Sequence, residues 1–486
     1  MKSKQAFNPF LPSYEYIPDG VPHIFGDRLY LYGSHDKFNG HSAGHSDYIC
    51  WSAPLNDLAD WNYEGIIYYR RQDPNSKGGA SHALRTPDVV KGSDGRYYLF
   101  YSLGRISRIG VAVSDKPTGP FRFLDYVRYQ DGKLLGSTGE PCQTDPSVFA
   151  DDDGTLYLYT GFAPSAHTKE QHKKHAGSPQ GAMVMRLSAD MHTLDGQIRY
   201  IGATTANSAG TSFEGHEFLC RPSVCKFSGR YYFVYTSVLR HEVCYATASA
   251  PDGIFHYGGI LISSCDIGRE GNELAQNYWG DTYGRLLRLK FGFYVFYNRQ
   301  TNRHQCSRQA CAEPIRFNGT RFLQAEPTSC GLNGGALRGI GLYRARIACV
   351  LYSKRGASEY RIRKKRKRYN PYFTQSGKDR THTPDQYIDN FRHGCVAGFK
   401  YFEFDGANQI IVTIKGNPRG KMIISETPTG KPLAKIRLTP CRDMTDFYAP
   451  FYQENGKHAL YFSYEGTGKF IFKEFRLQQV TRGNKD

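Results

Sequence analysis

Short apolar and aromatic runs, each following a glycine turn, recur along the first two thirds of the chain. The five copies read Gly26-DRLYLYGS, Gly95-RYYLFYS, Gly154-TLYLYTG, Gly229-RYYFVYTS and Gly292-FYVFYNR. A short apolar run precedes each glycine, so each copy predicts a β-hairpin. Five hairpins of one pattern indicate a repeat architecture, and their irregular spacing is typical of propeller blades joined by loops of variable length.

The fold class predicted from this pattern is all-β. Five four-stranded units closing into a ring form a five-bladed β-propeller, which we expect over residues 1–335. Further along, the alternating runs NQIIVTIKG, GKMIISE, HALYFSYEG and FIFKEFRL are typical of strands with one buried face. We expect them to form a separate β-sandwich over residues 336–486.

Composition supports this division and leaves the partner open. With 486 residues the chain is too long for one ordinary core, and its 36 Tyr and 30 Phe suit pleated, half-buried surfaces. The formal net charge of +18 fits either a basic surface alone or binding of an acidic polymer. We expect no nucleic-acid partner, because the basic run over residues 361–368 lacks interleaved aromatic residues.

The N-terminal residues are basic, but no apolar segment follows them, and no run of about 18 apolar residues occurs in the chain. We therefore expect a cytoplasmic protein with no membrane partner. The twelve cysteines show no zinc-type pairing, which in that compartment predicts reduced thiols. Nothing in the sequence predicts an oligomeric state.

The residues that carry candidate chemistry stand just before the first strand of each unit. They are Asp19, Asp88, Asp145, Cys220 and Asp281. The innermost strands of a propeller line its central channel, so four of the five units are expected to bring a carboxylate to one mouth of that channel. We favour a functional role for Asp19 and Asp145, whereas an ordinary turn role is an equal alternative for Asp88 and Asp281.

Several motifs in this order resemble the bacterial glycoside hydrolases of family 43, of the β-xylosidase and α-L-arabinofuranosidase type. They are YIPDG, PHIFGDRLYLYGSHD, DPSVFADDDGTLYLYTGF, TSFEGHEF, CAEPI and TSCGLNGG. The C-terminal strands are similar to the β-sandwich of family 6 carbohydrate-binding modules. The resemblance implies an inverting glycosidase that acts on arabinosyl, xylosyl or related glycosides of an oligosaccharide or polysaccharide-derived substrate; an anionic glycoside is a separate hypothesis that rests on the arginines named below. It implies no required cofactor and leaves open a structural calcium ion at the propeller axis.

The resemblance also implies roles for individual residues. An inverting enzyme needs an ionised base and a protonated acid on opposite faces of the sugar. Asp19 corresponds to the base, and Asp145 to the carboxylate that adjusts the pKa of the acid. The acid itself is a glutamate in family segments that resemble FFEASSIRK, where this chain has FLCRPSVCK, so Cys220 occupies the acid position. Glu217 or Glu214 is the candidate acid if the loop before Cys220 is shifted.

Other positions around the same pocket also depart from the family pattern. Arg85 replaces an aromatic residue, Tyr283 a histidine, Arg285 a serine, and Val21 a residue that is often acidic. The residues expected to contact the substrate are Asp88, Arg85, Arg221, Tyr283 and Arg285.

Three hypotheses follow from these departures. The first is a glycosidase with a displaced acid, and the second is a catalytically impaired pseudoenzyme that binds glycans. The third is a pocket adapted to an anionic sugar through its arginines. For each arginine, a salt bridge with a neighbouring aspartate is the competing explanation. A nucleophilic Cys220 requires a lowered thiol pKa, for which Arg221 is the candidate cause.

Overall fold

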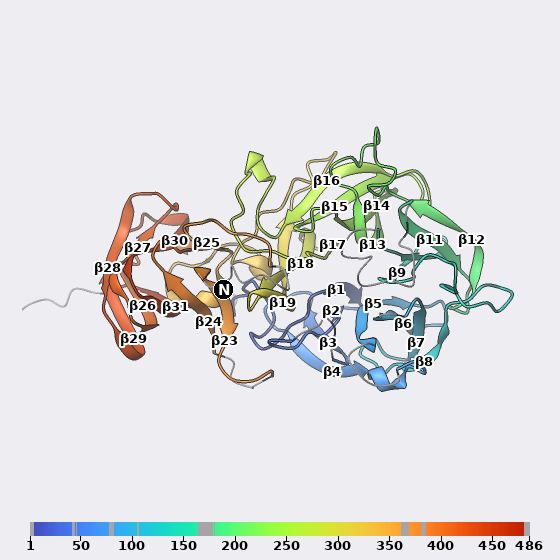
Figure 1. Cartoon of the computed structure of the whole chain (residues 1–486), viewed down its shortest axis with the longest axis horizontal. Coiled ribbons are helices and arrows are strands. Elements are labelled where there is room, and N and C mark those ends of the chain that lie inside the picture. Colours follow the sequence, from blue (N-terminus) through green and yellow to red (C-terminus); the bar gives the residue numbers. More distant parts are fainter. Residues whose placement is uncertain are drawn as a thin grey trace, which may run out of the picture.

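The computed structural model describes residues 4–40, 44, 46–76, 82–104, 106–163, 178, 180–360, 369–380 and 385–480. These residues form a ring of β-sheets beside a two-sheet sandwich, with a few 3-10 turns as the helical elements described (Figure 1). The predicted all-β class is confirmed. The basic run over 361–368 lies outside the described residues. Among those described, no helix has the length and apolar character needed to cross a membrane.

The propeller consists of five antiparallel sheets. Blade 1 contains β1 (Val21–Phe25), β2 (Arg28–Gly33), β3 (Tyr48–Pro54) and β4 (Asn62–Tyr68). Blade 2 contains β5 (Leu84–Lys91), β6 (Tyr97–Leu103), β7 (Ile109–Ser114) and β8 (Arg122–Tyr126). Blade 3 contains β9 (Ser147–Ala150), β10 (Leu156–Thr160), β11 (Ala182–Leu187) and β12 (Leu194–Ile201). Blade 4 contains β13 (Phe218–Phe227), β14 (Arg230–Ser237), β15 (Glu242–Ala248) and β16 (His256–Ser263). Blade 5 contains β17 (Gly284–Leu289), β18 (Gly292–Thr301) and β19 (His304–Ile315).

The predicted hairpins are the first two strands of each blade. Each repeat glycine lies at the turn between them, and positive φ angles, such as 64° at Gly26 and 83° at Gly95, explain why glycine is used there. The first strands β1, β5, β9, β13 and β17 surround the centre of the ring, and the last strands lie at its rim (Figure 1).

Blade 5 has three strands where the repeat predicted four, and the N-terminal segment lies against its outer strand instead. The backbone N–H of Phe10 donates to the carbonyl of Ala310 at 3.4 Å, and Asn8 Nδ2 donates to the carbonyl of Ala312 at 3.0 Å. The start of the chain therefore closes the ring, which the regular hairpin repeat alone does not reveal.

The sandwich is formed by two six-stranded sheets. One contains β20 (Leu337–Arg338), β22 (Val350–Tyr352), β25 (Val396–Phe404), β27 (Arg419–Ser425), β28 (Pro432–Leu438) and β30 (Gly456–Thr467). The other contains β21 (Gly341–Arg344), β23 (Tyr372–Gln375), β24 (Gln386–Arg392), β26 (Gln409–Gly416), β29 (Cys441–Pro450) and β31 (Lys469–Gln478).

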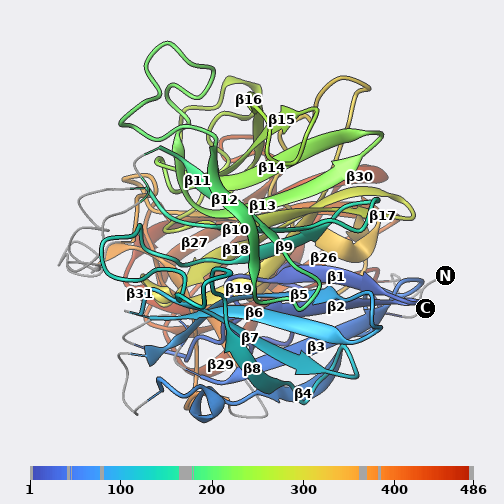
Figure 2. The same ribbon diagram turned by 90° about the vertical axis from the view of Figure 1, so that its right-hand side faces the viewer.

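The alternation read from the sequence corresponds to the buried face of these sheets. Ile410, Val412 and Ile414 on β26 are fully buried, and they pack in a core with Phe462 and Phe475. The sandwich also contacts the propeller directly, because Asn302 N after β18 donates to the Phe373 carbonyl of β23 at 2.8 Å. Figure 2 shows the two bodies from the propeller side. The domain boundary at 335/336 stays a prediction.

A buried carboxyl group on β19 connects the closing N-terminal segment to the propeller. Glu313 Oε1 accepts from Asn8 Nδ2 at 2.7 Å and from the backbone N–H of Thr328 at 2.5 Å, and Oε2 accepts from the Thr328 hydroxyl at 2.7 Å. Burial raises the pKa of Glu313 to about 8. The group is therefore largely protonated in the folded chain at moderate pH.

This raised pKa predicts a pH-dependent stability. Between the ordinary glutamate pKa and about 8 the unfolded chain has lost this proton while the folded chain keeps it, so the free energy of unfolding falls as pH rises. The expected contribution is about 1.4 kcal/mol per pH unit in that window. Glu313→Gln, which cannot ionise, is expected to remove this contribution in urea unfolding at pH 5, 6.5 and 8. The exposed Glu465→Gln serves as the control, and an unchanged slope in Glu313→Gln would contradict the prediction.

Candidate active site

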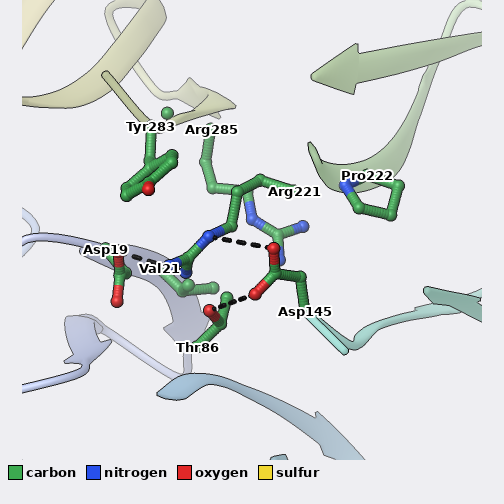
Figure 3. A pocket seen from close by; sticks show the side chains of 9 residues that line it. Asp19, Val21, Thr86, Asp145, Arg221, Pro222, Tyr283 and Arg285 are labelled. Carbon is green, nitrogen blue, oxygen red and sulfur yellow. Dashed lines mark hydrogen bonds and ion pairs between the residues drawn. The ribbon is translucent and has the colours of Figure 1, made fainter. Parts of the chain in front are cut away.

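A small pocket lies where the first strands of the blades begin, at one mouth of the central channel (Figure 3). Its lining residues are Asp19, Val21, Thr86, Asp145, Arg221, Pro222, Tyr283, Gly284 and Arg285. All five blades contribute, as expected if their inner strands converge. The structure therefore brings Asp19, Asp145, Arg221, Tyr283 and Arg285 together, and their chemical roles stay predictions.

A β-bulge turns Arg221 into this pocket. Along β13, Cys220 pairs with Thr236 but Ser223 pairs with Val234, so the ladder is irregular between them. Arg221 has a φ of 62°, in the left-handed region, and Pro222 has no N–H to donate to the ladder. The dipeptide Arg221-Pro222 thus explains locally why the strand bulges at the channel mouth.

Arg221 lies between the two carboxylates expected to act in catalysis. Its Nη1 is 3.1 Å from Asp19 Oδ1, and its Nε is 3.3 Å from Asp145 Oδ2. Its guanidinium stacks over the Tyr283 ring, with 4.0 Å between the guanidinium carbon and the ring centroid. The Asp19 side chain is 2% exposed and that of Arg221 12% exposed, so bulk water has almost no access to Asp19.

The charge state of Asp19 follows from two opposing effects. Burial alone would raise its pKa, but the charges of Arg221 and Arg308 outweigh burial and lower it. For Arg221, burial works in the same way against the charged form, and Asp145 and Asp19 outweigh it and raise its pKa. Asp19 is therefore held as a carboxylate next to a guanidinium that stays protonated.

Two polar contributors to this region were missed by sequence reasoning. Thr86 Oγ1 donates to Asp145 Oδ1 at 2.9 Å. Its position next to Arg85 and just before Pro87-Asp88 is the sequence feature that could have indicated a role at this site. Arg308 donates from Nε to Asp36 Oδ2 at 2.9 Å. No sequence signal connects these two residues, because they are 272 positions apart and belong to different blades.

Asp88, predicted to contact substrate, is instead bound within the protein. It accepts from Val148 N at 2.9 Å and lies 2.6 Å from His23 Nε2 and 3.3 Å from Arg285 Nη2. Burial would raise its pKa, but Arg285 and His23 lower it to about 2. Arg285 also donates to the Ser147 hydroxyl at 2.7 Å. Asp88 thus ties blades 1, 2, 3 and 5 together and does not line the pocket.

Two further predicted residues also lie away from the pocket lining. Asp281 accepts from Arg240 Nε at 2.6 Å, so its carboxylate is engaged in an ion pair. Arg85, predicted to bind substrate, does not line the pocket, and its backbone carbonyl accepts from the Tyr48 hydroxyl at 2.7 Å. The four-carboxylate mouth expected from the repeat is therefore reduced to Asp19 and Asp145.

Neither candidate for a displaced general acid is placed to act in the pocket. Glu217 Oε1 accepts from Ser208 Oγ at 2.9 Å, and its pKa is lowered despite burial because backbone N–H groups and Ser208 stabilise the carboxylate. The exposed Glu214 accepts from Gly210 N at 3.2 Å. Since neither lines the pocket, the hypothesis of a shifted loop finds no geometric support.

Cys220 does not line the pocket either, and its environment opposes nucleophilic chemistry. Burial and the nearby charge of Asp145 raise the pKa of its thiol well above the ordinary value, and Arg221 only partly offsets them. A neutral thiol is a poor nucleophile and a weak proton donor. Cys220, which occupies the acid position, is therefore poorly suited to act as a nucleophile or as a general acid in this arrangement.

The residues at the axis do not suit a calcium ion. Calcium takes six to eight oxygen ligands, whereas Asp19 and Asp145 face Arg221, and Asp88 faces Arg285. A dication would have to displace these guanidinium groups.

The same ion pairs bear on the hypothesis of an anionic sugar. Arg221 and Arg285 are each paired with aspartates of the protein, so nothing in the pocket favours an anionic sugar.

Comparison with known proteins now assigns the family. Residues 8–320 match the model of glycosyl hydrolases family 43. The chain belongs to this family. It is 41% identical over 481 residues to a xylosidase/arabinosidase of Thermoclostridium stercorarium, covering 98% of this chain and 99% of the relative. A xylosidase/arabinosidase of Bacteroides ovatus is 30% identical over 273 residues, covering 51% of this chain and 79% of the relative.

The fold agrees with solved structures of family 43. One is a family 43 arabinoxylan arabinofuranohydrolase from Bacillus subtilis in complex with cellotetraose, with a TM-score of 0.50 and 20% identity, covering 96% of this chain and 97% of that chain. This likeness shows the fold, a five-bladed propeller with sandwich-type sheets. As a member of a glycoside hydrolase family, the protein has a carbohydrate substrate. The likeness of its sandwich to a family 6 carbohydrate-binding module stays a prediction.

The burial of Asp88 predicts a large effect of removing its partner. Arg285→Met leaves a buried carboxylate without its guanidinium, which typically costs about 3–5 kcal/mol of stability. Chemical denaturation should show this loss, and Asp88→Asn combined with Arg285→Met should recover part of it. In the exposed pair Arg96–Asp94, solvent screens the charges, so Arg96→Met should lower stability far less than Arg285→Met does. Equal effects of Arg285→Met and Arg96→Met would contradict the buried pair's importance.

Proposed function

We propose that the protein hydrolyses terminal xylosyl or arabinosyl residues of a glycan with inversion, using Asp19 as the general base. Asp145 is proposed as the second carboxylate, which orients the sugar and influences proton transfer. The supporting observation is that Asp19 of blade 1 and Asp145 of blade 3 lie in one pocket. Each contacts a different nitrogen of the Arg221 guanidinium. The names of the two relatives, both xylosidase/arabinosidases, support the choice of sugar.

Two features of the pocket limit such a reaction. A base must reach a water molecule, so Arg221 has to give up its contact with Asp19 when substrate binds. The lining also contains no carboxylic acid besides Asp19 and Asp145. General acid catalysis typically contributes 10²–10⁴-fold to rate. Because the pocket lacks this acid, we expect slow hydrolysis of glycosides whose leaving group must be protonated before it departs.

A second function, glycan binding without cleavage, is favoured by a specific observation. Arg221 neutralises both carboxylates, and the acid position holds the Cys220 thiol, whose raised pKa keeps it neutral. Asp19, Asp145 and Arg221 present oxygen and nitrogen atoms whose mutual contacts in the pocket are ion pairs at 3.1 and 3.3 Å. These polar atoms are suited to sugar hydroxyl groups, which both donate and accept hydrogen bonds.

The dependence on the leaving group separates the two functions. We expect turnover of 4-nitrophenyl xylosides or arabinofuranosides, because nitrophenolate leaves without a proton, and at least about 100-fold slower cleavage of the matching xylo- or arabino-oligosaccharides. Asp19→Asn should abolish the nitrophenyl activity. If wild type and Asp19→Asn release nitrophenol equally slowly while oligosaccharides still bind by calorimetry, glycan binding without cleavage is the correct function.

Restoring the family pattern at the acid position provides the complementary test. The double variant Cys220→Glu, Arg221→Ala supplies a carboxylic acid and removes the guanidinium, so oligosaccharide cleavage should rise by about 10²-fold or more. Cys220→Gln, Arg221→Ala is the matched control, because it removes the same guanidinium without adding an acid. Equal oligosaccharide rates in the two double variants would show that the missing acid is not what limits the reaction.

A further inference from the structure

A second cavity lies at the junction of blade 5 and the sandwich, and its lining shares no residue with that of the candidate active site. It is lined by residues from the N-terminal segment, from β18 and β19, from the chain leading into the sandwich and from the turn before β22, among them Asn8, Arg299, Cys311, Thr328 and Cys349. The cavity has room for about one water-sized particle. Its walls are mostly buried side chains, so an occupant must be small.

Arg299 gives this cavity an unusual charge. The residue is 6% exposed and stacks on the Phe373 ring at 4.0 Å from guanidinium carbon to centroid. Its Nη1 donates to the carbonyl of Ala348 and its Nη2 to Gln309 Oε1, each at 3.1 Å. Its Nε has no hydrogen-bond partner, and no carboxylate forms an ion pair with it, within the part of the chain that the structure describes.

A second guanidinium adds to this unbalanced charge. Burial lowers the pKa of Arg299 to about 10, and burial together with the charge of Arg299 lowers that of Arg346 to about 10. Both groups therefore stay protonated near neutral pH. Arg346 donates only to the carbonyl of Pro9, at 3.5 Å, among the contacts described for it. Buried charges in proteins are normally paired, because an unpaired one loses its hydration without compensation.

The carboxyl group that adjoins the cavity does not supply the missing charge. Glu313 contacts three of the lining residues, Asn8, Tyr297 and Thr328, and forms no ion pair with a described arginine. Burial raises its pKa to about 8, so it is mostly neutral at pH 7. The remaining polar lining groups, including the side chains of Ser264 and Asn277, are neutral.

We propose that this junction cavity binds one monovalent anion of halide size, such as chloride, held by the guanidinium of Arg299. The cavity, the orphaned Nε and the absence of a described carboxylate partner all point to an anion and not to water alone. Arg299 joins β19 through Gln309, the turn before β22 of the sandwich through Ala348, and β23 through Phe373. A bound anion therefore stabilises the contact between propeller and sandwich.

A solution experiment tests this site on the full chain. Thermal unfolding is followed at constant ionic strength while sodium chloride replaces sodium gluconate, whose anion is too large for the cavity. The Tm of wild type is expected to rise by a few degrees and then level off, as for a saturable site. Arg299→Met should lose this dependence, and the exposed Arg288→Met on the same blade should keep it. A Tm that does not respond to chloride, or responds equally in Arg299→Met and wild type, overturns the proposal.

A crystallographic experiment keeps the test independent of how well the variant folds. Crystals of wild type soaked in sodium bromide should show an anomalous peak within hydrogen-bond distance of the Arg299 guanidinium. Bromide at surface sites with no peak in the cavity overturns the proposal. A peak in the cavity without any saturable chloride dependence of Tm would mean an adventitious ion only, and would overturn it as well.

Discussion

Pairing of arginine with aspartate at the propeller axis is the constraint on which the rest of this structure depends. Five inner strands meet there, and their sequence places several carboxylates at positions where water is excluded. Such groups repel one another unless cations neutralise them. Arg285 does so for Asp88, Arg308 for Asp36, and Arg221 for both Asp19 and Asp145. The same pairs that hold the blades together therefore decide how available the pocket carboxylates are.

This balance shapes the pocket of a family 43 chain that departs from the family pattern at the acid position. A base must be ionised and accessible, and here Asp19 is ionised but covered by Arg221. Two departures from the family pattern, Arg221 and Cys220, are neighbours on β13. The bulge at Arg221-Pro222 directs the guanidinium into the pocket, next to Cys220 at the acid position. Chemistry and packing at this mouth are thus coupled through one local irregularity of β13.

A related imbalance appears at the junction of blade 5 and the sandwich. There, the buried Arg299 and the half-buried Arg346 have no described carboxylate partner, and Glu313 is held largely neutral. Both the closure of the ring by the N-terminal segment and the contact with the sandwich pass through this region. The net charge of +18 is therefore not only a property of the surface, since part of it lies at the junction of the two domains.

Patterns along the chain predict the local features: five hairpins, the alternation of the sandwich strands, and the convergence of Asp19 and Asp145. These are predictable because glycine turns and alternation act over a few residues, and a repeat brings equivalent positions to one axis. The folded chain alone reveals which carboxylate faces which cation, how residues near Asn8 close the ring, and where the Glu217 side chain points. Side chains far apart in the chain settle those questions, as Arg308 and Asp36 do across 272 positions. Burial and charge interactions depend on distances in the folded chain, and no pattern along the sequence specifies those distances.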